Sequence, residues 1–296
     1  MTGFFTRASP TLQGILLNLA AIGIFTLMDA LAKHLILLGY HPLQVVWTRY
    51  AGQTVVMSVL IAPHLASVLR TRHPWLQAAR SVLQFGASAL FFLSLGHIGL
   101  AEATAIADAS PLLITLGAAI FLGEKIGPRR LAAVAAALVG ALIIIRPGSA
   151  VFSPAALLPL ACAFSFAGFA LLTRAMGAGE SLRTSLFYAA LFGTLITTAI
   201  LPFVWTPMAA GDLWGFVLIG ILGTLAQLCM VRAYALAEAA VIAPIGYLGI
   251  VLATLWGLLF FAERPDAMTI LGALVIIGAG LYVWHREARI AAASSQ

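Results

Sequence analysis

The chain has 296 residues, of which 62% are hydrophobic and only 9% are charged, and its formal net charge is +6. Soluble globular domains average about 25% charged and 45–50% apolar residues, so this composition excludes a water-soluble fold. The cations stand singly or in small groups between apolar runs. That distribution argues against a nucleic-acid partner and indicates membrane topology.

Ten apolar runs are each long enough to cross a bilayer as a helix, which takes roughly 20 residues. In chain order they cover residues 11–38, 43–62, 74–97, 101–123, 128–146, 153–175, 183–204, 213–235, 239–261 and 267–285. The connectors between them are short. The sequence therefore predicts an all-α polytopic membrane protein, with the first run retained because no small-residue cleavage site accompanies it.

The positions of Lys and Arg predict the orientation, because these residues concentrate in cytoplasmic loops. With the N-terminus inside, the inner side collects Arg7, Arg70, Arg72, Arg80, Lys125, Arg129, Arg130, Arg174, Arg183, Arg232, Arg286 and Arg289. The outer side receives only Lys33, Arg146 and Arg264. We therefore expect both ends of the chain in the cytoplasm, at the cell inner (plasma) membrane, which requires an even number of spans.

Several motifs recur along the chain in one order. GLAEATAI (99–106) returns as ALAEAAVI (235–242), and FLGEK (121–125) returns as FFAER (260–264). The sequence thus predicts two five-helix repeats, residues 1–148 and 149–296. Because five is odd, the second repeat enters the membrane with inverted topology. Inverted repeats are typical of transporters that alternate access around a site near the bilayer midplane.

The segment LAEATAIADASPLLITLGAAIFLGEKIGPRRLAAVAAALVGALIIIRPG (100–148) resembles the EamA-type domain of the drug/metabolite transporter superfamily. A small-acidic-small turn, a mid-span Ser-Pro, a Gly-Glu-basic corner and a closing Arg-Pro-Gly follow in that order. The resemblance covers essentially the whole chain as two such domains. It implies a ten-helix transporter from a branch that includes exporters of amino acids and other metabolites. Asp108 stands where that family usually has an apolar residue.

Two prolines mark a candidate substrate site. Pro111 and Pro244 lie at corresponding places in the fourth and ninth spans, and each frees a backbone carbonyl four residues earlier. Paired interruptions of corresponding helices indicate a binding site at the midplane. The alternative is that each proline only kinks its helix for packing.

Polar and aromatic side chains supply the other candidate substrate-binding residues. Helical spacing places Asp108 and Thr115 on the same stripe as Pro111. The remaining candidates are Gln84, Ser88, Phe166, Phe169, Gln227 and Tyr247. Hydrogen bonding between helices is the alternative role for the polar members. Lipid contact or packing is the alternative for the two phenylalanines.

Two charges, Asp29 and Lys33, lie one helical turn apart in the first span, where a charge is costly. They can pair along the helix, with Lys33 reaching the outer interface, and Arg49 is a second candidate partner for Asp29. In a structural interpretation the three charges neutralise one another. In a functional interpretation, Asp29 or Asp108 meets a substrate ammonium group or a coupling proton.

Together these features predict a secondary transporter that exports hydrophobic or aromatic amino acids or related small amphipathic metabolites, as a monomer or weak homodimer. A carrier of nucleotide sugars, sugar phosphates or drugs on the same fold is the alternative. A polyanion calls for several cations in the cavity, and only Lys33 and Arg49 qualify. An enzyme is disfavoured because no HExxH, GxSxG, Gly-rich phosphate loop or metal-spaced cluster occurs. No cofactor or metal is expected.

Overall fold

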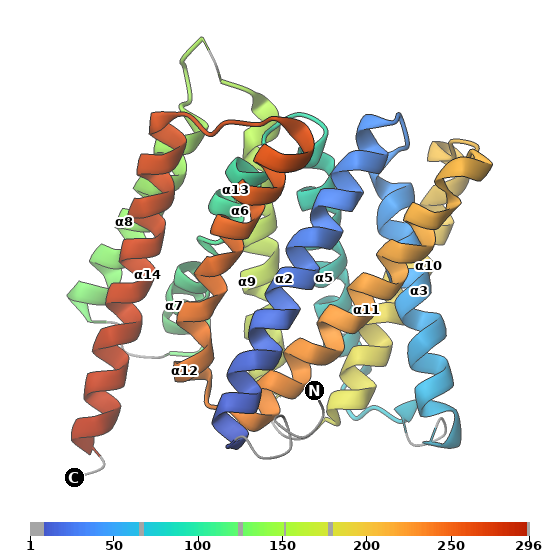
Figure 1. Cartoon of the computed structure of the whole chain (residues 1–296). Helices are drawn as coiled ribbons and strands as arrows, with labels where there is room; N and C mark the ends of the chain where they lie inside the picture. The colour runs from blue at the N-terminus through green and yellow to red at the C-terminus, as the bar shows by residue number, and fades with distance from the viewer. Residues whose placement is uncertain (1–8, 65–67, 124–126, 151, 177–179, 295–296) are drawn as a thin grey trace.

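The structure, a computed structural model, describes residues 9–64, 68–123, 127–150, 152–176 and 180–294, and within these ranges it contains helices and no strand (Figure 1). Nine helices in this part of the chain are long and apolar enough to cross a membrane. A tenth, α3 (Pro42–Ile61), has 20 residues and packs among them. The predicted all-α architecture of ten long helices is confirmed.

The helices follow the predicted spans closely. The first half of the chain forms α2 (Pro10–Leu37), α3, α5 (Pro74–Leu95), α6 (Leu100–Ala107), α7 (Ser110–Phe121) and α8 (Pro128–Ile145). The second half forms α9 (Leu157–Met176), α10 (Leu182–Val204), α11 (Leu213–Leu236), α12 (Ala239–Ile242), α13 (Leu248–Phe261) and α14 (Ala267–Ser294). Short 3-10 segments are η1 (Ala62–His64), η2 (Pro154–Ala156), η4 (Ala210–Asp212) and η5 (Ala243–Tyr247).

Both described ends of the chain lie at one end of the bundle. The helix α2 begins, and α14 finishes, at the end drawn lowest in Figure 1, which we call the lower end. The opposite end is the upper end. This arrangement agrees with an even number of crossings. Arg7 and Lys125, two of the predicted inner cations, lie outside the described residues, as does part of the Gly-Glu-basic corner.

Several helices begin at a proline. Pro10, Pro42, Pro74 and Pro128 are the first residues of α2, α3, α5 and α8. Proline suits this position because the first backbone N–H of a helix has no partner within the helix, and because the ring fixes φ near the helical value. The prolines therefore place the starts of these four helices where the hydrophobic runs begin.

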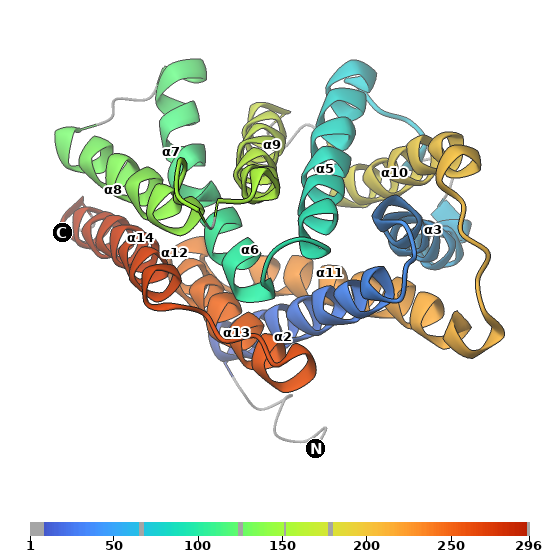
Figure 2. The same ribbon diagram turned by 90° about the horizontal axis from the view of Figure 1, so that it is seen from above.

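The two halves of the chain interleave. The most extensive helix contacts pair α2 with α11, α5 with α9, α8 with α14, and α3 with α10, and Figure 2 shows these neighbours from above. Glycines also allow α3 and α11 to approach each other closely. A Cβ atom on Gly52 of α3 would lie 2.6 Å from the Cα atom of Gly220 on α11. The apolar faces of each half are thus covered largely by the other half.

The fourth and ninth crossings are interrupted at their prolines, as predicted. The helix α6 ends at Ala107 and α7 begins at Ser110, directly before Pro111. In the ninth crossing, η5 separates α12 from α13. Backbone groups freed within a bilayer must find partners inside the protein. One such partner is the buried Asn18 of α2, whose Nδ2 donates to the carbonyl of Ile242 at 3.4 Å.

At the lower end, Glu180 holds the chain segment that leads into α5. Its Oε1 accepts hydrogen bonds from the Thr71 hydroxyl at 2.7 Å, the Arg72 N–H at 2.6 Å and the His73 N–H at 3.1 Å. Burial opposes ionisation of this carboxyl group, but these hydrogen bonds outweigh burial and hold the pKa of Glu180 below its ordinary value of 4.5.

We expect Glu180→Gln to lower the free energy of unfolding near neutral pH by less than about 1 kcal/mol, because the group is close to solvent. Since the folded pKa is depressed, the charge stabilises the fold above about pH 4.5, and this contribution is lost as the pH falls through the folded pKa. Thermal unfolding of both proteins in detergent across this range measures the effect. A difference in Tm that stays constant in acid would assign it to shape instead of charge.

Candidate functional site

Three charged side chains from three helices lie close together in the interior of the bundle. Asp29 belongs to α2, Arg49 to α3, and Asp108 is the residue that caps the C-terminal end of α6. The charge of Asp29 interacts with those of both Arg49 and Asp108. We call these three residues the central charge cluster. Two carboxyl groups thus accompany one guanidinium group.

Arg49 is surrounded by aromatic rings. The centre of its guanidinium lies 5.7 Å from the ring centroid of Phe25, 5.8 Å from that of Tyr50 and 6.0 Å from that of Phe92. Its Nη1 donates to the Ser88 hydroxyl at 3.2 Å, and Ser88 is also within 2.9 Å of the Tyr50 hydroxyl. Cation–π attraction and one hydrogen bond therefore hold the cation against an apolar wall.

Asp108 lies at the gap between α6 and α7. Its backbone N–H donates to the carbonyl of Thr104 at 2.9 Å, which completes the last turn of α6. Its charge interacts with Asp29, with Cys162 of α9 and with Tyr247 of η5. The Oδ2 atom is buried and has no hydrogen-bond partner among the described residues. The break in the fourth crossing thus places a carboxylate beside the break in the ninth.

Gln84 and Ser88, two of the predicted substrate-binding residues, lie on the α5 side of the cluster. Ser88 binds Arg49 directly, and the Tyr50 hydroxyl donates to the backbone carbonyl of Gln84 at 3.2 Å. The side-chain Oε1 of Gln84 is buried without a partner in the described structure. Tyr50 and the ring of Phe92 were missed by the sequence analysis. Phe25 could have been predicted, because it lies four residues before Asp29 on α2 and therefore on the same helix face.

Tyr247 approaches α14 closely. A Cβ atom on Gly280 would lie 1.7 Å from the Tyr247 Oη. Only a glycine at this position leaves room for the phenol. Two other predicted residues, Gln227 of α11 and Pro244 of η5, are half-buried. Within the described part of the chain, neither forms a hydrogen bond to the central charge cluster.

The remaining predicted residues are engaged elsewhere. The Thr115 hydroxyl donates to the carbonyl of Pro111 at 3.1 Å, a bond within α7 itself. The ring of Phe169 lies 4.9 Å from the guanidinium of Arg80, which is buried among α5, α9 and α10. Phe166 is 42% exposed and its ring lies 5.5 Å from that of Phe169. The structure joins these residues to local contacts and not to the cluster.

The predicted pairing of Lys33 with Asp29 is wrong. Lys33 forms an ion pair with Glu263, and its Nζ donates to the carbonyl of Ile98 at 2.6 Å. The residue is 3% exposed, so its charge is held inside the protein. Glu263 also accepts from the N–H of Leu100 at 2.8 Å, at the N-terminal end of α6. The partner was missed because it lies 230 residues away, beyond the reach of helical spacing.

Arg49, the second candidate partner of Asp29, interacts with it electrostatically. Among the described residues no ion pair within 4 Å joins the two, and the guanidinium hydrogen-bonds Ser88 instead. Asp29 therefore partly neutralises Arg49 without holding it.

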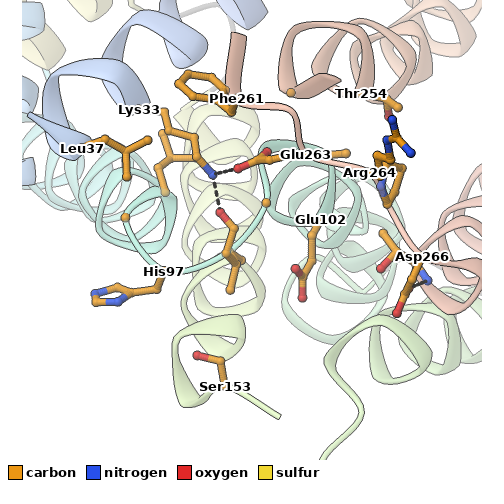
Figure 3. A pocket seen from close by; sticks show the side chains of 18 of the residues that line it. Lys33, Leu37, His97, Glu102, Ser153, Thr254, Phe261, Glu263, Arg264 and Asp266 are labelled. Atoms are coloured by element: carbon orange, nitrogen blue, oxygen red, sulfur yellow. Dashed lines mark hydrogen bonds and ion pairs between the residues drawn. The ribbon is translucent and has the colours of Figure 1, made fainter. Parts of the chain in front are cut away.

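A pocket of about 660 Å³ opens beside the Lys33–Glu263 pair at the upper end of the bundle. Figure 3 shows Lys33 directed at Glu263 across its wall, with Glu102 and Asp266 nearby. We call this pocket the upper vestibule. A second ion pair, Arg146 Nη2 to Asp266 Oδ2 at 2.5 Å, lies in its lining. The upper vestibule could have been anticipated from the positions of the predicted outer cations, because Lys33, Arg146 and Arg264 all line it.

None of the predicted substrate-binding residues lines the upper vestibule. Two of its cations are already paired with carboxylates of the same pocket, and one buried polar atom there, Arg146 Nε, lacks a partner in the described structure, against three at the central charge cluster. A transported molecule also has to pass the interior of the bundle. We therefore take the cluster, and not the upper vestibule, as the candidate transport site.

Comparison with known proteins gives one family. The EamA-like transporter family matches residues 12–146 and again residues 153–284. A riboflavin transporter of Rhizobium johnstonii is 34% identical over 224 residues, which cover 75% of this chain and 74% of that protein.

Two further relatives match over more of their length. The pseudopaline exporter CntI of Pseudomonas aeruginosa is 31% identical over 90% of this chain and 93% of its own. An S-adenosylmethionine uptake transporter of Rickettsia prowazekii is 24% identical over 93% of this chain and 94% of its own. A solved crystal structure at 20% identity shares the fold, with a TM-score of 0.64 over 94% of this chain and 98% of that one.

Proposed function

The chain belongs to the EamA-like transporter family, and on that premise we propose that it exports hydrophobic or aromatic amino acids, or close relatives of them, by alternating access. That it is a membrane transporter of small molecules and not an enzyme follows from the family and its named relatives. The relatives are named for three different cargoes and for both uptake and export. The cargo is therefore argued from the site.

The central charge cluster carries the proposal. A guanidinium and two carboxyl groups lie against the rings of Phe25, Tyr50 and Phe92. An aromatic amino acid presents the complementary set, an ammonium group, a carboxylate and a flat apolar side chain. Small-molecule sites commonly combine apolar walls with a few fixed polar groups of this kind. A polyanionic cargo fits poorly, because carboxyl groups outnumber the cation here.

Export, orientation and mechanism complete the proposal. The exporter is 31% identical to this chain and the uptake transporter of Rickettsia prowazekii is 24% identical over a similar length, which supports outward transport. The excess of cations at the lower end supports cytoplasmic chain ends in the inner membrane. Two inverted repeats, each with one interrupted helix, support alternating access around the cluster. A proton that moves with the substrate is a further proposed partner of the carboxyl groups.

Counterflow in proteoliposomes tests the cargo. Vesicles are loaded with phenylalanine, and the entry of external labelled phenylalanine is followed against protein-free vesicles. We expect a transient accumulation that unlabelled tryptophan and tyrosine suppress and that lysine and glutamate do not. Equal suppression by charged amino acids would contradict an aromatic pocket. A flat signal for all amino acids would remove the amino-acid proposal and leave the family assignment intact.

A further inference from the structure

Three buried polar atoms without partners surround the candidate transport site. Four such side-chain atoms occur in the described part of the chain: Arg49 Nε, Gln84 Oε1, Asp108 Oδ2 and, at the upper vestibule, Arg146 Nε. Leaving a buried polar group unpaired is energetically unfavourable, so each instance needs an explanation. The gathering of three of the four around one cluster indicates that a bound molecule supplies their partners.

The chemistry of the three atoms is specific. Arg49 Nε is a donor, whereas Gln84 Oε1 and Asp108 Oδ2 are acceptors. A carboxylate offers acceptors to a guanidinium, and an ammonium group offers three donors. A molecule that bears both groups satisfies the set, while a purely anionic or purely apolar molecule leaves at least one buried acceptor unpaired.

The surroundings of Asp108 assign the two groups to their places. Among the described residues, the groups that interact electrostatically with Asp108 are the Asp29 carboxyl from α2, the Cys162 thiol from α9 and the Tyr247 phenol from η5, and none of these three is a cation. Arg49 is already partly neutralised by Asp29. Asp108 is therefore the carboxyl group of the cluster without a cation beside it, and a cationic group of the substrate would be its partner.

We infer that Asp108 binds the ammonium group of the transported amino acid and that Arg49, through Nε, binds its carboxylate. The inference rests on the proposed function and adds that the site recognises the two charged groups of the amino acid with unequal strength. The ammonium group meets an unpaired carboxylate, while the carboxylate meets a guanidinium that Asp29 already attracts. The amine is therefore the more strongly required of the two groups.

Equilibrium binding to the purified full-length protein in detergent tests this assignment without transport. Labelled phenylalanine is displaced by three compounds that share one ring: phenylalanine, 2-phenylethylamine, which lacks the carboxylate, and 3-phenylpropionate, which lacks the amine. Hydrogen bonds to charged groups contribute about 1.5–3 kcal/mol, or roughly tenfold or more in affinity. We expect 3-phenylpropionate to bind at least about tenfold more weakly than 2-phenylethylamine.

Two variants are tested for binding of the same three compounds. Asp108→Asn should weaken phenylalanine and 2-phenylethylamine by about tenfold or more and leave 3-phenylpropionate unchanged or tighter. Arg49→Lys keeps the charge beside Asp29 but removes the fork of donors, so it should weaken phenylalanine and 3-phenylpropionate and spare 2-phenylethylamine. Glu238→Gln removes an exposed carboxylate outside the site and should change none of the three affinities.

The outcomes separate this inference from the proposed function. If the wild-type protein binds phenylalanine but binds 3-phenylpropionate as tightly as 2-phenylethylamine, the assignment of Asp108 fails whether or not the variant folds. Equal weakening of all three compounds by Asp108→Asn would make its role structural. If Asp108→Asn removes the pH dependence of binding but leaves the preference for amines unchanged, Asp108 is a proton site and the assignment is overturned. Binding of none of the compounds by wild type would overturn the proposed cargo itself.

Discussion

We expect Glu263→Gln to lower the free energy of unfolding by about 3 kcal/mol, the lower part of the range for breaking a buried ion pair. The loss arises because Lys33 is 3% exposed and would keep its charge without a counter-ion. The Ile98 carbonyl, which accepts from Lys33 at 2.6 Å, would remain as its partner. Unfolding in detergent, followed by heat or denaturant, measures the difference.

Replacing the other partner of the ion pair, Lys33, is expected to lower the free energy of unfolding by less. Lys33→Met removes the buried charge and leaves Glu263, whose side chain is 26% exposed, still bonded to the Leu100 N–H. The double variant, which combines Lys33→Met with Glu263→Gln, should therefore be more stable than Glu263→Gln alone, because the uncompensated cation is gone. If the two single effects are similar and add in the double variant, the ion pair does not couple α2 to the segment after α13.

The second large effect is expected at a helix crossing. Gly272→Ala on α14 should destabilise the protein toward the upper end of about 1–3 kcal/mol, the usual cost of overpacking a close contact. The added Cβ would lie 2.5 Å from the Gly140 carbonyl oxygen and 2.5 Å from Ile144 Cγ1. The carbonyl belongs to the α8 backbone and cannot rotate away, so α8 and α14 must separate.

The same helix supplies the control. At Gly278, no atom of another described element lies within 4 Å of the position of an added Cβ. Gly278→Ala should therefore leave stability unchanged or raise it by about 0.5–1 kcal/mol, since alanine loses less backbone entropy in a helix. Folded yield and Tm of the two variants, compared side by side, check the crossing. Similar losses at both positions would show that α14 resists alanine for a reason other than its contact with α8.

The spans and their interruptions were predictable because they depend on local chemistry. Roughly twenty apolar residues make a crossing, and a proline inside one removes a backbone donor wherever the rest of the chain lies. Pro111 and Pro244 therefore mark real breaks in α6–α7 and α12–α13. The ten-helix architecture follows from the same local counting.

The partners of the charges were not predictable in the same way. Spacing on one helix brings Asp29 to within a turn of Lys33, but the fold turns Lys33 toward Glu263, which lies in the segment between α13 and α14. The contacts of Arg49 with Ser88 and the ring of Phe92 likewise depend on how α3 packs against α5. A single sequence contains no information on which pair of helices meets at which depth, so side-chain partners across the bundle have to come from the structure.

The interleaving of the two halves bears on how the chain assembles. Because α2 packs on α11, α5 on α9 and α8 on α14, each half on its own would present unmatched contact faces to lipid. If the chain were cut between α8 and η2, folding would require two separate fragments to meet in the membrane. The rate of that step would depend on the concentration of both fragments. A short covalent tether instead holds such fragments at an effective concentration of about millimolar. The few residues between the halves thus supply proximity, which makes completion of the bundle independent of how much protein the membrane contains.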